Sequence, residues 1–328
     1  MYLITGATGT VGRHLISQLL AAGAPVRAVT RNPGPAAALG LPDRVGLVRL
    51  DPADGPAALA PALEGATALF LHPRAVGDGA SDLVALARER GVRKVVALSA
   101  LNVDDPLNEQ PSRYRGDRNK EAEQAAADSG LAWTSLRAAS FAGNALQAWG
   151  PQIRAGDLVR YPFARFQESP LDERDLAEVA ALALLTDDLI DRQVRLTGPE
   201  TLSHEESVAV IGRPLRFQEV PPHAAAEGMI RHGLPEPFVT ALMARYIRHA
   251  GRAQHPATGE LAGVLGRPAR TFAEWAADHT ADFRSAAFLT STFRGTELRS
   301  ADPRSADLPS ADLPSTTEHA AASRGPNT

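Results

Sequence analysis

The stretch TGATGTVG, Thr5 to Gly12, decides the fold of this 328-residue chain. It stands between an apolar run, YLIT, and a segment whose apolar residues recur at helical spacing as far as Gly23. Its three glycines, Gly6, Gly9 and Gly12, follow one another at intervals of three, as they do where a strand turns sharply into a helix. The free amide groups at the start of such a helix bind phosphate. The stretch therefore predicts the first turn of a dinucleotide-binding βαβ unit.

Apolar strands and amphipathic helices alternate through the first 140 residues. Apolar strands joined by helices form parallel sheets that are buried on both faces. The pattern therefore predicts an α/β fold, a doubly wound Rossmann-type parallel sheet. The predicted strands are residues 2–5, 25–30, 44–50, 66–71, 94–99 and 131–137. The predicted helices between them include residues 11–23, 55–65, 82–91 and 118–130.

The alternation weakens after residue 140. Helices are predicted over residues 174–186, 206–212 and 269–283, with a strand over residues 192–198. We divide the chain into a dinucleotide-binding core, residues 1–140, and a smaller substrate lobe with returning core elements, residues 141–284. Residues 285–328 repeat Ser-Ala-Asp among prolines and carry few large apolar side chains, so they are predicted to be a disordered tail.

The overall composition narrows the classes of function. The net charge is −4, which provides no basic surplus for nucleic acid. There is no cysteine, so disulfides and thiolate chemistry are excluded. No apolar run approaches the ~20 residues that span a bilayer, and the N-terminus lacks the basic region of a signal peptide. We expect a cytoplasmic monomer or homodimer that acts on a small molecule, with no nucleic-acid or membrane partner.

Each residue of the glycine-rich turn has an expected role in binding a dinucleotide. Gly6 permits the tight turn, Gly9 lets the pyrophosphate approach the backbone, and Gly12 lets the helix pack closely on the strand. Thr8 and Thr10 add hydroxyl donors. The remaining predicted contact in this turn is Val11. The alternative is a structural turn without a ligand.

The end of the second strand indicates which dinucleotide binds. An acidic residue there would favour NAD, but the strand ends in AVTRNP, which places Arg31 at that point. A guanidinium pairs with a 2′-phosphate in a bidentate manner, so NADP(H) is predicted in preference to NAD(H). The alternative is a solvated arginine in an arginine-rich chain.

TGATGTVG followed by VTRNP resembles the NmrA-like branch of the atypical short-chain dehydrogenases/reductases. Other similar stretches are RLDPAD, KVVALSA, EAEQAAADSGLAWTSLRAASFAGNAL and SPLDERDLAEVAALAL, and the resemblance covers roughly residues 1–284. It implies that Asp51, in RLDPAD, lies near the adenine. It also implies that Ser99, at the end of the fifth strand, helps to hold the substrate.

Many of these reductases use a Tyr-x-x-x-Lys pair on one helix, in which the lysine also orients the nicotinamide ribose. Lys120 is near the expected position, but the residue four before it is Gly116. Tyr114 lies six residues before Lys120, about 120° away on a continuous helix, so the two do not form the pair. If Gly116 breaks the chain and Asp117 caps the helix, Tyr114 would lie in a loop and could still reach the nicotinamide. The alternative is that Tyr114 is an aromatic residue of the surface or of the pocket wall. Ser99, Lys120 and Tyr114 are the candidate catalytic residues.

Side chains after two other strands complete the candidate site. His72 follows the fourth strand and is expected near the nicotinamide, as a proton donor or a loop residue. Phe141 and Asn144 follow the sixth strand and are expected to face the substrate, and the alternative is that they pack in the core and cap the loop. Asp172 and Asp175 are interpreted as helix caps. No histidine or carboxylate spacing indicates a metal site.

Two functions fit this sequence. The first is an NAD(P)H-dependent reductase of a small cyclic, quinone-like or polyketide-type carbonyl compound. A quinone accepts hydride with little acid assistance, so positioning alone would suffice. The alternative is a non-catalytic, NAD(P)-sensing NmrA-like regulatory protein.

Overall fold

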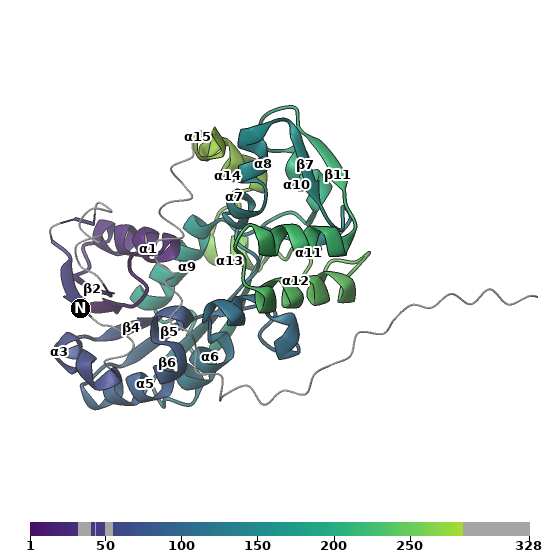
Figure 1. The fold of residues 1–328 in the computed structure, drawn as a ribbon. Coiled ribbons are helices and arrows are strands. Elements are labelled where there is room, and N and C mark those ends of the chain that lie inside the picture. Colours follow the sequence, from purple (N-terminus) through teal and green to yellow (C-terminus); the bar gives the residue numbers. More distant parts are fainter. Residues whose placement is uncertain (32–40, 43, 50–54, 285–328) are drawn as a thin grey trace, which may run out of the picture. The chain divides into compact units, whose positions relative to one another are not determined.

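The computed structural model describes residues 1–31, 41–42, 44–49 and 55–284. In this part of the chain, seven parallel strands form one sheet, in the order β3-β2-β1-β4-β5-β6-β9 (Figure 1). The strands are β1 (Tyr2–Ile4), β2 (Val26–Thr30), β3 (Gly46–Arg49), β4 (Ala68–Leu71), β5 (Lys94–Ala100), β6 (Ala132–Ala138) and β9 (Arg192–Leu196). The strand order reverses between β1 and β4, and ligands of such sheets bind beside the carboxyl ends of the strands at that point.

Alternate residues of each strand enter two separate hydrophobic cores. In β1, Ile4 faces one core and Leu3 the other, and both are fully buried. In β5, Val96 lies on the Ile4 side and Val95 on the Leu3 side. This two-residue period, with both faces apolar, explains why these segments form interior parallel strands.

Helices cover both faces of the sheet (Figure 1). The Ile4 face is covered by α1 (Thr10–Ala21), α9 (Glu173–Leu185) and α13 (Glu260–Leu265). The Leu3 face is covered by η2 (Pro56–Leu59), α3 (Ala60–Leu63), α4 (Pro73–Val76), α5 (Ala80–Glu89) and α6 (Asn119–Ala127). The 3-10 helix η3 (Gly77–Gly79) joins α4 to α5. Between β5 and α6 the chain forms two short 3-10 helices, η4 (Leu107–Glu109) and η5 (Pro111–Arg115).

The segments after β6 build a smaller lobe. They contain two small sheets among the described residues, an antiparallel β8–β10 pair and a parallel β7–β11 pair. The elements are α7 (Asn144–Ala148), α8 (Gly150–Ala155), β7 (Leu158–Tyr161), β8 (Gln167–Glu168), β10 (Leu202–Ser203), α10 (His204–Ala209), β11 (Arg216–Glu219), α11 (Pro222–Arg231), α12 (Glu236–Arg248), α14 (Phe272–Asp278) and α15 (Thr280–Arg284). Trp149, Tyr161, His204 and Tyr246 pack edge to face in its interior.

The predicted fold class, a doubly wound Rossmann-type sheet, is confirmed, and α9 and β9 return to it from beyond residue 140. Three predicted helices differ clearly from those observed. The one predicted over residues 55–65 is the 3-10 helix η2 followed by α3. The helix predicted over residues 206–212 begins earlier because Ser203 and Glu206 form a capping box. The one predicted over residues 269–283 is two helices, α14 and α15. The predicted disordered tail lies outside the described residues. None of the described helices is long and apolar enough to cross a membrane.

Candidate functional site

At two positions of the glycine-rich turn after β1, neighbouring atoms leave no room for a side chain. Gly6 has φ +66°, and a Cβ placed on it would lie 2.6 Å from Cγ of His72. A Cβ on Gly12 would overlap the Gly6 carbonyl oxygen and lie 2.8 Å from Cα of Ala7. A Cβ on Gly9, by contrast, meets only the Gly6 oxygen, at 3.3 Å. Gly6 and Gly12 therefore shape the turn, and the surface at Gly9 stays open.

No side chain of the cap or of the first turn occupies the N-terminus of α1. Gly9 is the N-cap and supplies no side-chain hydrogen bond, and the first turn has no acidic residue. Gly9 and Thr10 are exposed and Thr8 is half-buried. Val11 is buried in the core, so only its backbone amide is available to a ligand. The unpaired amides and the helix dipole at this end fit the pyrophosphate of a dinucleotide.

The loop after β4 is bound to the turn through His72. Its backbone N–H donates to Oγ1 of Thr5 at 2.8 Å, and its Nδ1 accepts from the Arg74 N–H at 3.3 Å. Burial lowers the pKa of the His72 imidazole to about 4, against the opposing effect of Asp117. The ring is therefore neutral near neutral pH, and the Nδ1 acceptor role leaves the proton on Nε2. His72 presents a hydrogen-bond donor and is not an imidazolium acid.

The segment between β5 and α6 is anchored to this loop by an ion pair. Nε and Nη2 of Arg74 donate to the two carboxylate oxygens of Asp117 at 3.0 and 2.6 Å. Gly116, at φ +90°, ends η5, and α6 begins two residues after Asp117. The prediction that Gly116 interrupts the chain is confirmed, but the Asp117 cap is wrong, because its carboxylate is held by Arg74 and α6 has no side-chain cap.

Ser99 faces a buried carboxylate on α6. Glu123 accepts hydrogen bonds from Ser135 at 2.5 Å, from Arg137 at 2.5–3.2 Å and from Gln193 at 3.1 Å. The Ser99 hydroxyl approaches the same carboxylate but makes no hydrogen bond of normal geometry. Burial would raise the pKa of Glu123, but these donors outweigh it and hold the pKa below its ordinary value. Ser99 is thus the buried hydroxyl of this group that is left without a hydrogen bond.

The two other candidate catalytic residues lie apart on different elements. Tyr114 is on η5 with an exposed side chain, and Lys120 is on α6 with 56% of its side chain exposed. Nζ of Lys120 is 3.7 Å from Asp104, which also pairs with Arg137. The structure therefore does not assemble a Tyr–Lys pair on α6.

The loop after β6 carries the two predicted substrate residues. Phe141 is half-buried against the core and Asn144 is exposed at the start of α7. Just before them, Ser140 donates to Glu168 at 2.5 Å, and Glu168 also accepts from Arg245 of α12 at 2.6 Å. This chain of hydrogen bonds holds the loop against the lobe.

One predicted cofactor contact, Arg31, is at the carboxyl edge of the sheet. Arg31 is exposed directly after β2 and follows the buried Thr30. It therefore lies at the carboxyl end of the strand that neighbours β1. Asp51 lies outside the described residues.

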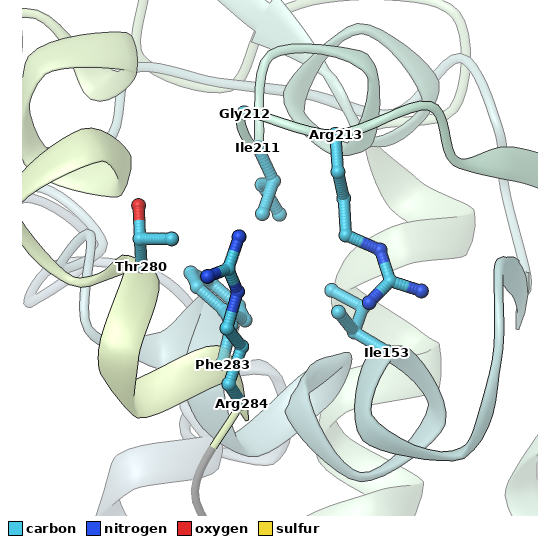
Figure 2. Close-up of a pocket in the computed structure, with 7 residues that line it drawn as sticks. All are labelled: Ile153, Ile211, Gly212, Arg213, Thr280, Phe283 and Arg284. Carbon is cyan, nitrogen blue, oxygen red and sulfur yellow. The ribbon is translucent and has the colours of Figure 1, made fainter.

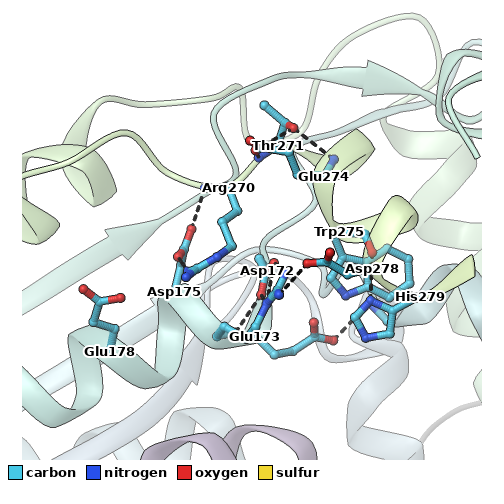
Figure 3. A network of polar contacts seen from close by, with 12 residues as sticks. Asp172, Glu173, Asp175, Glu178, Arg270, Thr271, Glu274, Trp275, Asp278 and His279 are labelled. Carbon is cyan, nitrogen blue, oxygen red and sulfur yellow. Dashed lines mark hydrogen bonds and ion pairs between the residues drawn. The ribbon is translucent and has the colours of Figure 1, made fainter. Parts of the chain in front are cut away.

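The acidic residues at the start of α9 are structural (Figure 3). Asp172 caps the helix by accepting from the Arg174 N–H at 2.8 Å, as predicted. Asp175 does not cap: it is fully buried inside the helix and pairs with Arg267 and Arg270. These ion pairs join α9 to the segment that precedes α14. They also allow Asp175 to be buried, since an unpaired carboxylate would be costly there.

The smaller lobe contains a small hollow. Figure 2 shows Arg213 and Arg284 beside it, together with apolar side chains of α8 and α15. None of the residues predicted for cofactor or substrate lines it. In the described segments, no group of His, Asp and Glu could hold a metal ion.

The strand order and the open glycine turn together define a dinucleotide-binding protein of the Rossmann class. The sequence profile of the NAD(P)H-binding family matches residues 6–186. The chain belongs to this family.

Three similar proteins cover nearly the whole chain. A (4-alkanoyl-5-oxo-2,5-dihydrofuran-3-yl)methyl phosphate reductase of Streptomyces griseus is 35% identical, over 86% of this chain and 99% of its own. An NAD(P)H azoreductase of Xenophilus azovorans is 30% identical, over 87% of this chain and 100% of its own. The fold matches an NADPH-dependent quinone oxidoreductase of Escherichia coli in complex with NADPH, with TM-score 0.71, 24% identity and coverage of 85% and 99%.

The sequence analysis missed several residues of this region. Glu123 is a buried acid on α6 between apolar alanines, and its position on the apolar face was an available signal. The pairing of Arg74 with Asp117 joins residues 43 apart, and no pattern in the sequence indicates it. Arg115 was overlooked among its neighbouring arginines.

Proposed function

We propose that this protein is an NADPH-dependent reductase of small, electron-poor carbonyl compounds, including cyclic, quinone-like and polyketide-type ones. The observation that carries the proposal is the open N-terminus of α1 above Gly9, beside a neutral His72 packed on Gly6. Two relatives at 30% identity or more are reductases by name, and one of them acts on a lactone phosphate.

The residues of the glycine turn would hold the cofactor. The Gly9 amide donates to the Gly6 carbonyl at 3.0 Å, so the amides of Thr10 and Val11 would bind the pyrophosphate. The guanidinium of Arg31 would bind the 2′-phosphate and so select NADP(H). Bound NADPH supplies a hydride to an electron-poor double bond, which also takes up one proton, and it leaves as NADP⁺.

The chain's own groups would orient the acceptor. Nε2–H of His72 is a donor beside the glycine turn, and its orientation is fixed because Nδ1 is occupied by the Arg74 amide. The element that carries Tyr114 has no lysine, so Tyr114 would act as a phenol without the help of a neighbouring ammonium group. Otherwise, solvent would supply the proton. This arrangement suits acceptors that need little acid catalysis.

One observation favours a second function, a dinucleotide sensor without turnover. Lys120 is mostly exposed and Tyr114 is on another element, so the usual catalytic pair is missing. Such a protein would distinguish NADPH from NADP⁺ in affinity and consume neither.

The test follows NADPH absorbance with a panel of quinones, enones and butenolides. Substrate-dependent consumption above ~1 s⁻¹ would support the reductase. Gly12→Ala is the matched control, since its Cβ would overlap the turn and remove binding. If no acceptor is reduced while calorimetry gives different affinities for NADPH and NADP⁺, the protein is a sensor and the reductase proposal is wrong.

A further inference from the structure

Arg115 joins three segments at the carboxyl edge of the sheet. It is the last residue of η5, between β5 and α6. Its guanidinium carbon lies 4.0 Å from the ring centroid of Phe238 on α12, and its Nη1 donates to Oε1 of Gln147 on α7 at 3.1 Å. These two contacts hold the guanidinium in one orientation, because stacking and the hydrogen bond act on different parts of it.

The neighbouring arginines are all neutralised, and Arg115 is not. Ion pairs of 2.6 Å join Arg113 to Glu121, Arg118 to Asp78 and Arg74 to Asp117. Among the described residues, no carboxylate lies within ion-pair distance of Arg115, and Nε and Nη2 have no acceptor.

The electrostatic surroundings of Arg115 are unfavourable to its charge. Burial, and then the charge of Arg74, lowers the pKa of the Arg115 guanidinium, against the smaller opposing effect of Asp117, which is itself paired with Arg74. A half-buried cation that lacks a counter-ion is costly unless a ligand supplies one. The two open donors of its planar fork match the oxygens of a phosphate.

The neighbours of Arg115 connect it with two parts of the candidate site, the loop that holds His72 and the helix that begins with Asn144. Gly116 lies against Arg74, whose amide binds the His72 ring. Gln147 follows Asn144 by three residues on α7, so the two share one face of that helix. Arg115 thus stands between the loop that holds His72 and the helix that begins with Asn144.

We infer that Arg115 binds a phosphate ester carried by the substrate, so that the reduced double bond lies toward His72. This inference rests on the proposed reductase function. Arg115 is then a specificity-determining residue, with Gln147 and Phe238 positioning its guanidinium.

The experiment compares kcat and KM, at saturating NADPH, for a butenolide methyl phosphate, for the same butenolide as the free alcohol, and for neutral menadione. We expect the wild type to prefer the phosphate by about tenfold or more in kcat/KM. Arg115→Gln should abolish the preference through KM, Arg115→Lys should retain part of it, and neither should alter menadione reduction. Arg165→Gln, an exposed charge-matched control, should keep the preference.

Three results would overturn the inference. The first is equal use of the phosphate and the alcohol by the wild type. The second is an equal loss of activity with the phosphate and with menadione in Arg115→Gln, because such a loss indicates a structural role. A weaker NADPH affinity in Arg115→Gln would assign the arginine to the cofactor. No reduction of any acceptor, menadione included, contradicts the proposed function instead. Calorimetric titration of the NADPH-loaded protein with the butenolide phosphate then still tests Arg115.

Discussion

The imidazole of His72 occupies the space that a side chain on Gly6 would need, with Cγ 2.6 Å and Cδ2 2.7 Å from the position of a Cβ. The contact joins the turn after β1 to the end of β4, the two neighbouring strands between which the strand order reverses. The shape of the pyrophosphate turn and the orientation of the ring therefore depend on each other.

Gly6→Ala should disrupt cofactor binding more than folding. Its methyl group would displace His72, and an alanine at φ +66° costs about 1 kcal/mol in addition. We expect NADPH affinity, measured by fluorescence titration, to fall at least tenfold. Gly23→Ala is the control, because Gly23 has φ +75° and nothing within 4 Å of a Cβ. Equal losses of affinity in both variants would contradict the role of the His72 contact.

The ionisation of His72 should make the protein less stable in acid. Its pKa is about 4 in the folded protein and 6.5 in the reference state, so the unfolded chain takes up the proton first as the pH falls. Stability is therefore present above pH 6.5 and is lost progressively down to about 4. His72→Asn retains an acceptor for the Arg74 amide and does not titrate, so its Tm should fall less over this range. His223→Asn, at an exposed position, should behave like the wild type.

Glu173 should have the opposite dependence on pH. Burial raises the pKa of this carboxyl to about 7, while one of its oxygens accepts from the Gly143 amide at 3.0 Å. The unfolded chain releases the proton near 4.5, so folding stability falls as the pH rises from there to about 7. Glu173→Gln keeps the acceptor, and in urea unfolding at about pH 8 it should gain up to roughly 3 kcal/mol. A gain no larger than that of the exposed control Glu227→Gln would refute this assignment.

Arg31 should determine the preference between the two dinucleotides. A guanidinium on the 2′-phosphate contributes about 1.5–3 kcal/mol, so Arg31→Ala should lower the ratio of NADPH to NADH affinity by roughly tenfold or more. NADH affinity should change little. Arg93→Ala, at the opposite end of the strands, should leave the ratio unchanged. An unaltered ratio in Arg31→Ala would remove the reason for preferring NADPH.

Substitutions of Tyr114 and Lys120 should distinguish catalysis by positioning alone from general acid catalysis. Because they lie on different elements, we expect Tyr114→Phe to reduce turnover of a quinone by less than about tenfold, against the ~10²–10⁴ of a general acid. If Lys120 orients the nicotinamide ribose, Lys120→Ala should weaken NADPH binding and Lys120→Arg should restore it poorly. Wild-type behaviour of Lys120→Ala in both assays would exclude Lys120 from the site.

The local pattern of the chain was enough to predict the core of the fold. The glycines at positions 6, 9 and 12 and the apolar strands carry their own geometric requirements, namely a positive φ, a close backbone approach and two buried faces. These requirements act over a few residues, so the sequence reveals them directly. The positions of Ser99 and His72 at strand ends follow from the same reasoning.

The surroundings of the candidate site depend on contacts between distant residues, so only the three-dimensional structure reveals them. The Asp117 carboxylate, adjacent to a predicted helix, is held by Arg74 from another loop and so does not cap. Within the described part of the chain, Arg115 differs from Arg113 and Arg118 in having no carboxylate at ion-pair distance, which depends on how η5, α7 and α12 pack. Side-chain electrostatics is set by distances in space, and a local pattern in the chain carries no record of them.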